Sequence, residues 1–261
     1  MDQGGAEPML AGIRIGAWTL TALLAASPAW SAADYAREKK WAEEIVPGIV
    51  VGEPVTLTDP HGRRFLAIYT ETKNAKAAVV VVHGMGVHPD WGLISTLRSQ
   101  LPDMGYTTLS VQMPVLAAEA KPEQYEQTFP EAAQRLAAAV AYLKAKGYSK
   151  IALVSHSLGA RMSAYYLVNH AHAPVSAWVA IGHSGPFKDA QNLKIPVLDL
   201  YGEQDFPQVL AAAPQRAAAI ERIPGSAQVT VKGADHFFNG HESALAAEVG
   251  AFLDRTLAAA R

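Results

Sequence analysis

Hydrophobic and polar positions along the chain change period repeatedly, from strand-like runs to helix-like spacing. Residues 78–82, AVVVV, are apolar without interruption, and such runs are typical of central strands in a parallel sheet that is covered on both faces. Residues 91–101 follow with apolar positions at helical spacing, and pairs of strand and helix recur to the C-terminus. This alternation predicts an α/β fold, in which crossover helices cover both faces of a mostly parallel central sheet.

The same pattern gives the expected bounds of each element. The expected strands are 49–57, 63–71, 78–82, 106–114, 150–155, 175–182, 195–202 and 227–233, and the expected helices are 34–45, 91–101, 130–146, 158–169, 208–221 and 243–257. The turn TDPHG joins the first two strands, which predicts a hairpin.

Two intervals depart from the alternation. Residues 112–129 contain two prolines and few periodic apolar positions, so we expect a long loop over one edge of the sheet. Residues 183–194 form only a short link between two strands, which leaves no room for a sizeable lid domain.

The N-terminal stretch predicts a secretory signal peptide. Arg14 precedes an apolar run at 15–26, and small residues follow at 29 and 31–33. The run is shorter than the roughly 20 residues that a membrane span needs, and no later segment is long and apolar enough to be one. We expect cleavage after Ser31 or Ala33, a single domain over 34–261, and export to the periplasm, or secretion if the source is not Gram-negative. The alternatives are an uncleaved anchor or a buried helix.

Composition excludes several classes of function. The chain of 261 residues has no cysteine, which excludes disulfides, thiolate metal sites and a cysteine nucleophile. Its formal net charge is −2 without a run of like charges, so nucleic acid is not an expected partner. No phosphate-binding loop or dinucleotide fingerprint occurs. His170 and His172 have no evident third ligand, and we therefore expect neither a cofactor nor a metal.

Candidate catalytic residues follow the ends of the expected strands, where sites form in parallel sheets. Ser157 lies in SHSLG, between a strand and a helix. The pattern is close to G-x-S-x-G, the sharp turn that presents a nucleophilic serine, and the small residues around the serine relieve crowding there. Ser155 replaces the first glycine. The alternative is that Ser157 serves only as a helix N-cap.

Asp205 and His236 follow two later strands, in YGEQD and GADHFF. An acid at the first position would fix the tautomer of a histidine at the second. Glu203 and His241 are the rival acid and histidine, and a helix cap or a structural histidine are the alternative interpretations.

The glycine turn HGMG follows the most apolar strand. The backbone N–H groups of Met85 in this turn and of Leu158 beside the serine are the candidate oxyanion donors. The alternative is a glycine turn without a ligand. Three further residues follow strand ends and are candidates for substrate binding: His88, Trp91 and His183. His156 is expected to point toward the sheet, and we assign it no role.

Serine, acid and histidine occur in the order of the α/β-hydrolase triad. The segments HGMG, SHSLGA, YGEQD and GADHFFNGHE resemble the α/β-hydrolase superfamily, from about residue 55 to the C-terminus. The stretch from HGMGVHPDW to LSVQMP also resembles an uncharacterised family of exported proteobacterial α/β-hydrolase-like proteins. The order of the three residues predicts a Ser157–His236–Asp205 triad, the short link at 183–194 predicts a minimal lid, and the resemblance implies an α/β-hydrolase fold.

The residues and the resemblance together predict a serine hydrolase of the carboxylesterase type. Its substrate would be a small-molecule or envelope-associated ester. Two alternatives stay open from the sequence. One is an acyltransferase that uses the same triad, and the other is a non-catalytic envelope binding protein on a hydrolase scaffold.

Overall fold

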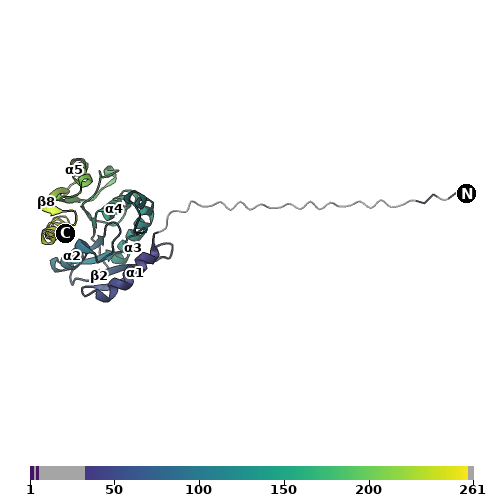
Figure 1. The fold of residues 1–261 in the computed structure, drawn as a ribbon, viewed down its shortest axis with the longest axis horizontal. Coiled ribbons are helices and arrows are strands. Elements are labelled where there is room, and N and C mark those ends of the chain that lie inside the picture. Colours follow the sequence, from purple (N-terminus) through teal and green to yellow (C-terminus); the bar gives the residue numbers. More distant parts are fainter. Residues whose placement is uncertain (3, 6–32, 258–261) are drawn as a thin grey trace.

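The computed structural model describes residues 1–2, 4–5 and 33–257. The expected signal peptide, residues 1–33, lies almost entirely outside the described residues. Residues 33–257 contain one eight-stranded sheet of order β1-β2-β4-β3-β5-β6-β7-β8 (Figure 1). The strands are β1 Glu53–Thr58, β2 Arg64–Thr70, β3 Ala77–Val82, β4 Tyr106–Val111, β5 Ile151–His156, β6 Ala177–Ile181, β7 Val197–Gln204 and β8 Ala227–Asp235.

The helices lie close to their predicted positions. They are α1 Tyr35–Ile45, α2 Gly92–Gln100, α3 Phe129–Ala145, α4 Leu158–Asn169, α5 Pro207–Ile220 and α6 Glu242–Leu257, with short 3₁₀ segments η1 Val46–Gly48, η2 Leu101–Met104, η3 Pro122–Thr128 and η4 Ala190–Asn192. The predicted hairpin is confirmed, because β1 pairs antiparallel with β2. All pairings from β4 and β3 through to β8 are parallel.

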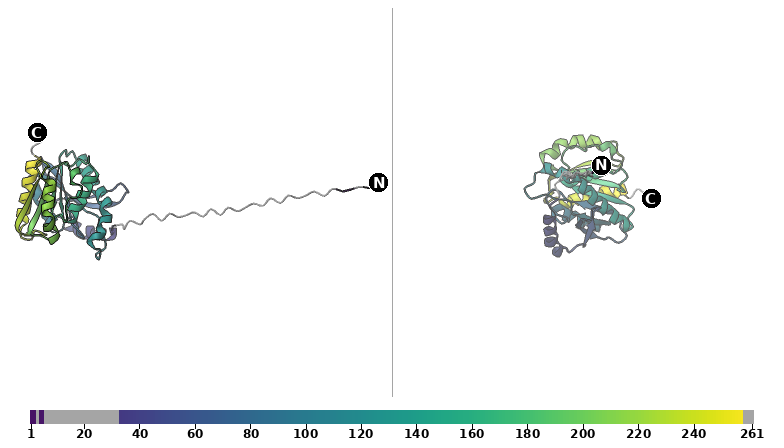
Figure 2. Two further views of the ribbon diagram at one scale, coloured as in Figure 1. Left: turned by 90° about the horizontal axis from the view of Figure 1, so that it is seen from above. Right: turned by 90° about the vertical axis from the view of Figure 1, so that its right-hand side faces the viewer.

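The apolar strand β3 lies inside the sheet and contributes to two cores. Ala78, Val80 and Val82 pack with α3 and α4 on one face, while the intervening residues of β3 pack with α2 and α6 on the other. This division follows from the strand period of two residues. Figure 2 (left) shows the yellow helix α6 and the teal helix α3 on opposite sides of the ribbon. The predicted α/β architecture is therefore confirmed.

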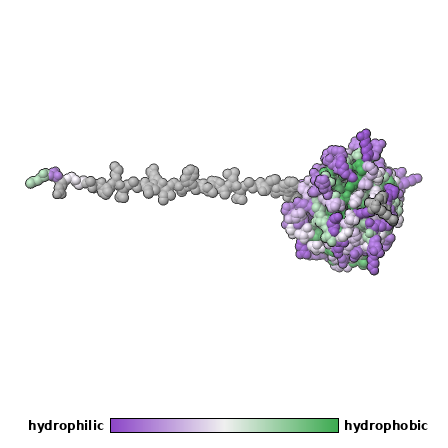
Figure 3. All heavy atoms as spheres, turned by 180° about the vertical axis from the view of Figure 1, so that it is seen from behind, coloured by the Kyte–Doolittle hydropathy of each residue, from purple (hydrophilic) through white to green (hydrophobic). Residues whose placement is uncertain are grey.

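The face of the molecule opposite to that of Figure 1 is mainly polar. Figure 3 shows hydrophilic residues over most of the face seen from behind, with smaller hydrophobic areas between them. No helix among the described residues combines the length and the apolar character that crossing a membrane requires.

The prediction of a loop over the edge at 112–129 is wrong in part. Met113, Val115 and Leu116 are almost completely buried, and the segment ends in η3, where Tyr125 is also buried. Met113, Leu116 and Tyr125 join the same core as α3. The sequence pattern does not predict this burial, because the prolines and the short apolar stretches of the segment follow neither a helical nor a strand period.

Helix α1 is fixed to this segment and to α3 by buried charge. Arg135 of α3 donates to both carboxylate oxygens of Glu38 on α1, at 2.8 and 3.2 Å. Glu38 also accepts the backbone N–H of Val115 at 3.2 Å. Because an unpaired buried charge is costly, these contacts hold the three segments in one arrangement.

Candidate active site

Ser157 lies at the turn between β5 and α4 with a strained backbone. Its φ is +56° and its ψ is −122°, a region that residues other than glycine occupy only when the surrounding structure enforces it. The hydroxyl does not cap the helix, because no side-chain hydrogen bond from Ser157 reaches the first turn of α4. The N-cap interpretation therefore does not account for this serine.

Two glycines allow the turn to approach the end of β3. A Cβ on Gly159 would lie only 2.2 Å from the carbonyl oxygen of His83, so no larger residue fits there without a backbone shift. A Cβ on Gly84 would lie 3.2 Å from Cβ of Ser157. The glycine turn HGMG is thus in direct contact with the serine turn, as the sequence pattern predicts.

Ser155, which replaces the first glycine of the motif, is completely buried and has two partners. Its Oγ accepts the indole N–H of Trp178 at 2.8 Å and donates to the carbonyl of Val179 at 3.2 Å. The substitution therefore supplies an acceptor for a buried indole. It leaves the turn intact, since Ser157 keeps its strained conformation.

His236 joins Ser157 to Asp205. Its Nδ1 lies 2.6 Å from Oδ1 of Asp205, and its Nε2 lies 3.0 Å from Oγ of Ser157. The Asp205 carboxylate also accepts the backbone N–H of Phe206 at 2.7 Å. With Nδ1 as the donor to Asp205, Nε2 is the atom that would accept the serine proton, and this is the hydrogen-bond order of a Ser-His-Asp triad.

The imidazole of His236 is enclosed by its neighbours. The ring of Phe206 stacks on it at 4.1 Å between centroids, and Phe237 meets it edge-on at 5.1 Å. Below the ring, a Cβ on Gly182 would lie 2.9 Å from Cε1 of His236. These contacts leave His236 only 4% exposed, so its orientation is set by packing as well as by hydrogen bonds.

The rival residues lie outside this chain of hydrogen bonds. Glu203 is exposed and accepts the backbone N–H of Gly233 at 2.9 Å. The Nδ1 of His241 interacts with the carbonyl of Asn239 at 3.1 Å.

Strands β7 and β8 both extend beyond their predicted ends, with an irregular register between Gly202 and Gln204. Asp205 and His236 therefore each follow directly on a strand.

Sequence reasoning missed His156. Its ring is buried and lies 4.7 Å from that of His236, and its Nε2–H donates to the backbone carbonyl of His236 at 2.9 Å. Burial lowers the pKa of His156 to about 3, so the ring is neutral at ordinary pH. The sequence offers one signal for this contact, because His156 is the residue directly before the serine. Side chains alternate along β5, and this alternation places His156 on the face of the sheet that α2 and α6 cover, next to the loop that holds His236.

His83 fixes the glycine turn from inside. Its Nε2 accepts the backbone N–H of Met113 at 2.9 Å, and therefore its Nδ1–H donates to the carbonyl of Gly84 at 2.8 Å. Burial lowers the pKa of His83 to about 3. No described residue accepts the N–H groups of Met85 or Leu158, the two predicted oxyanion donors, and that of Leu158 lies at a helix N-terminus, where anions are stabilised.

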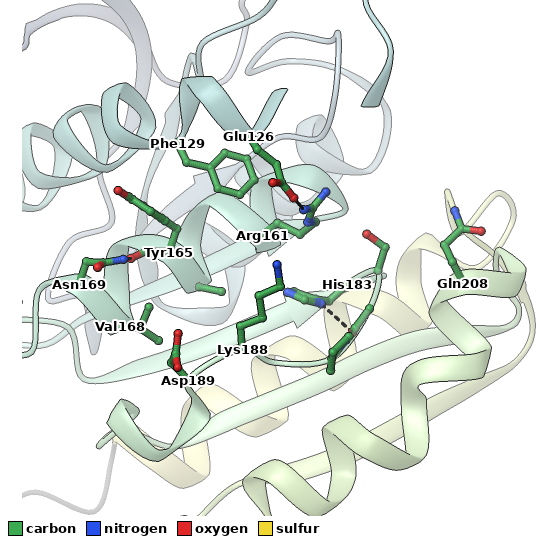
Figure 4. Close-up of a pocket in the computed structure, with 14 residues that line it drawn as sticks. Glu126, Phe129, Arg161, Tyr165, Val168, Asn169, His183, Lys188, Asp189 and Gln208 are labelled. Carbon is green, nitrogen blue, oxygen red and sulfur yellow. Dashed lines mark hydrogen bonds and ion pairs between the residues drawn. The ribbon is translucent and has the colours of Figure 1, made fainter. Parts of the chain in front are cut away.

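The structure places the three candidate binding residues in different surroundings. Trp91 meets Phe237 edge-on at 5.6 Å, beside the catalytic candidates. His88 instead packs against Trp41 of α1 at 5.7 Å. His183 lines a pocket of about 650 Å³ that runs along α4 (Figure 4). Neither His88 nor Trp91 is among the residues that line this pocket.

Solved structures with this fold include α/β hydrolases and esterases. A protein of unknown function from Agrobacterium tumefaciens, described as a candidate α/β hydrolase, has a TM-score of 0.64 and 18% identity over 79% of this chain and 97% of its own. The esterase domain of a Rhodothermus marinus protein has a TM-score of 0.60 and 17% identity over 78% and 98%. An α-β serine hydrolase homologue from Coxiella burnetii has a TM-score of 0.60 and 19% identity over 78% and 99%.

At these identities the likeness shows the fold alone, which is that of the α/β hydrolases. Comparison with curated protein sequences finds no match. A family model described as "Protein of unknown function (DUF3530)" matches residues 52–134 and 117–255, a span that runs from the start of β1 into α6 and includes every residue of the hydrogen-bonded Ser157, His236 and Asp205 set. The chain therefore belongs to the DUF3530 family, and it has an α/β-hydrolase fold.

Proposed function

We propose that this protein is a serine hydrolase that cleaves carboxylic esters through an acyl-enzyme on Ser157. The observation that carries the proposal is the continuous hydrogen-bond chain from Oγ of Ser157 through His236 to Asp205, with distances of 3.0 and 2.6 Å. The burial of His236 and Asp205, each 4% exposed, supports it, because a fixed arrangement away from water lowers the cost of reorganisation during the reaction.

In the proposed reaction, Nε2 of His236 takes the proton of the Ser157 hydroxyl as Oγ attacks the ester carbonyl carbon. The resulting oxyanion accepts the N–H groups of Leu158 and Met85. Asp205 stabilises the imidazolium that forms. The C–O bond to the alcohol then breaks, and the alcohol leaves with the proton from His236. Water attacks the acyl-enzyme by the same route in reverse, which releases the acid and restores Ser157.

Labelling with a fluorophosphonate probe tests this proposal. The full chain should become covalently labelled, whereas the variant Ser157→Ala should not. Hydrolysis of p-nitrophenyl esters of increasing acyl length should show the same dependence on Ser157. If the unaltered protein is folded, stays unlabelled and hydrolyses none of these esters, the proposal is wrong.

Matched pairs of variants separate the proposed triad from its sequence rivals. Asp205→Asn and His236→Gln should each lower kcat by several orders of magnitude, as in other triads. Glu203→Gln and His241→Gln, which change the rival acid and histidine, should retain the activity of the parent. If Glu203→Gln lowered kcat as much as Asp205→Asn, or His241→Gln as much as His236→Gln, the assignment of the triad would be contradicted.

We also propose that residues 1–33 are a signal peptide and that residues 34–261 form the exported mature domain, which is periplasmic in a Gram-negative cell and secreted in any other. The apolar run at 15–26 after Arg14 supports this. Cell fractionation with N-terminal sequencing of the mature chain tests it. The expected first residue is Ala32 or Asp34, and a cytoplasmic protein that keeps its first residues would contradict the proposal.

A further inference from the structure

The pocket along α4 adjoins the proposed active site at three of its lining residues. Arg161 lies four residues after Ser157, and its backbone N–H donates to the carbonyl of that serine at 3.3 Å. His183 follows Gly182, the residue beneath the ring of His236. Gln208 lies in the first turn of α5, two residues after the ring that stacks on His236. The pocket therefore lies next to the site of the proposed reaction, although Ser157, Asp205 and His236 are not among its lining residues.

Most of the pocket wall is apolar. Phe129 comes from the start of α3, Ala164, Tyr165 and Val168 from α4, and Pro186 from the link between β6 and β7. A pocket of about 650 Å³ is within the range that holds a small ligand, and such pockets take their specificity from the few polar groups placed among apolar ones.

Two cationic side chains, Arg161 and Lys188, lie at one end of this pocket (Figure 4). Arg161 forms an ion pair with Glu126, so the charge of that guanidinium is already compensated. Lys188 lines the same pocket, and no ion pair joins it to another of the described residues. Figure 4 shows its amine extending between Arg161 and His183, whereas Asp189 lies on the Val168 side. Lys188 is the uncompensated cation of the pocket.

His183 adds no positive charge at this end. Burial lowers its pKa to about 3, so the ring is neutral at ordinary pH. Its Nδ1 faces the carbonyl of Gly185 at 3.3 Å and must carry the proton. The two side chains that present N–H groups to a ligand here are therefore Lys188 and Arg161, and of these only Lys188 has no ion-pair partner among the described residues.

We propose that this pocket binds an ester substrate that carries a carboxylate or a phosphate, with Lys188 as the ion-pair partner of that anion and the apolar wall in contact with the chain between anion and ester. The inference rests on the proposed esterase function and adds the class of substrate to it. Arg161 remains available for a second hydrogen bond, because its pair with Glu126 uses only part of the guanidinium.

Binding of small probes tests the pocket without any turnover. Hexyl phosphate and hexanoate, titrated calorimetrically into the Ser157→Ala variant, should bind at least fivefold more tightly than the neutral 1-hexanol, and added salt should reduce this preference. The comparison of phosphate with carboxylate identifies which anion the site favours. Binding of 1-hexanol with the same affinity as both anions would overturn the proposal.

Two lysine variants separate the pocket from general surface charge. Lys188→Gln should remove the preference for the two anions, with a loss of about fivefold in their affinity. Lys194→Gln is the matched control, since Lys194 is exposed on the same link and donates to the carbonyl of Gln191 outside the pocket lining. Equal effects of the two variants, or none from Lys188→Gln, would overturn the proposal.

Inhibition connects the pocket to the reaction. Hexyl phosphate should inhibit hydrolysis of p-nitrophenyl butyrate competitively in the parent protein, and about fivefold more weakly in Lys188→Gln. If the parent shows neither labelling nor hydrolysis but Ser157→Ala binds the anions through Lys188, only the catalytic proposal fails. If hydrolysis occurs and hexyl phosphate neither binds nor inhibits, the pocket proposal fails.

Discussion

The indole N–H of Trp178 donates to Oγ of Ser155 at 2.8 Å, inside a core where both residues are completely buried. This bond crosses from β6 to β5 two residues before the proposed nucleophile. Ser155 therefore has a structural role that glycine, the usual residue of the motif, cannot perform.

Restoration of the motif glycine should harm the protein. Ser155→Gly leaves the indole N–H of Trp178 buried without an acceptor, which should lower the free energy of unfolding by about 1–3 kcal/mol. Urea denaturation measures this change. Ser155→Ala should account for most of the loss without the added backbone freedom of glycine, and fluorophosphonate labelling of Ser157 should persist in both. A Gly variant as stable as the parent would contradict the role assigned to the bond.

Gly159 should not tolerate a methyl group. Its added Cβ would lie 2.2 Å from a carbonyl oxygen at the end of β3. Because this clash is with the backbone and not with a flexible side chain, Gly159→Ala should unfold at a clearly lower temperature and label poorly. Gly48→Ala is the control, since a Cβ there would meet no atom within 4 Å. Similar melting temperatures for the two variants would contradict the close approach.

His156 is expected to act as a positioning residue. His156→Leu removes the donor to the His236 carbonyl, and the loss of this bond should lower kcat about tenfold with little change in KM. His156→Gln, which keeps an N–H donor, should recover part of the loss. Steady-state kinetics on one p-nitrophenyl ester measure both. If Gln and Leu reduce kcat equally, volume rather than the hydrogen bond is responsible.

Buried histidines should make the fold acid-sensitive. Burial lowers the pKa of His83, His156 and His183 from 6.5 to about 3, so between these pH values the unfolded chain binds protons that the folded chain does not. The free energy of unfolding therefore falls as pH falls through this window, by about 1.4 kcal/mol per pH unit for each such histidine. Above pH 7 these residues contribute no slope.

Urea denaturation at several pH values measures that slope. The slope is proportional to the number of protons that the chain takes up on unfolding, and His183→Gln should reduce that number by about one between pH 4.5 and 6. Between pH 7 and 8 the variant and the parent should have the same slope, which serves as the control. An unchanged slope in the acidic range would show that His183 is not held neutral in the folded state.

Strong local patterns in the sequence predicted the fold well. The apolar run of β3 and the Ala-rich α3 were located closely, because each has a clear period and, in α3, a terminating glycine with a φ of +95° at Gly147. The segment 112–129 was not, since its burial depends on contacts with α1 and α3 rather than on its own pattern.

The proposed site could be predicted only in part, for a related reason. Ser157, Asp205 and His236 follow the C-terminal ends of parallel strands, so they lie along the same side of the sheet. Their order in the sequence is enough to predict this placement. The proposed role of His156 depends on a backbone carbonyl 80 residues away, and that of Lys188 depends on its having no anionic partner among the residues that the structure describes. Neither has a signature in a single sequence.

The hydrogen-bonded chain of Ser157, His236 and Asp205 also implies that the proposed active site is completed late in folding. His236 is separated by 79 residues from Ser157 and by 31 from Asp205. The three residues follow β5, β7 and β8, so they meet only after these strands have paired with β6 between β5 and β7. Such distant parallel pairing is slow because chain entropy is lost before the contacts form. During refolding from urea, reactivity of the serine should therefore return after helical structure does, and it would report completion of the sheet.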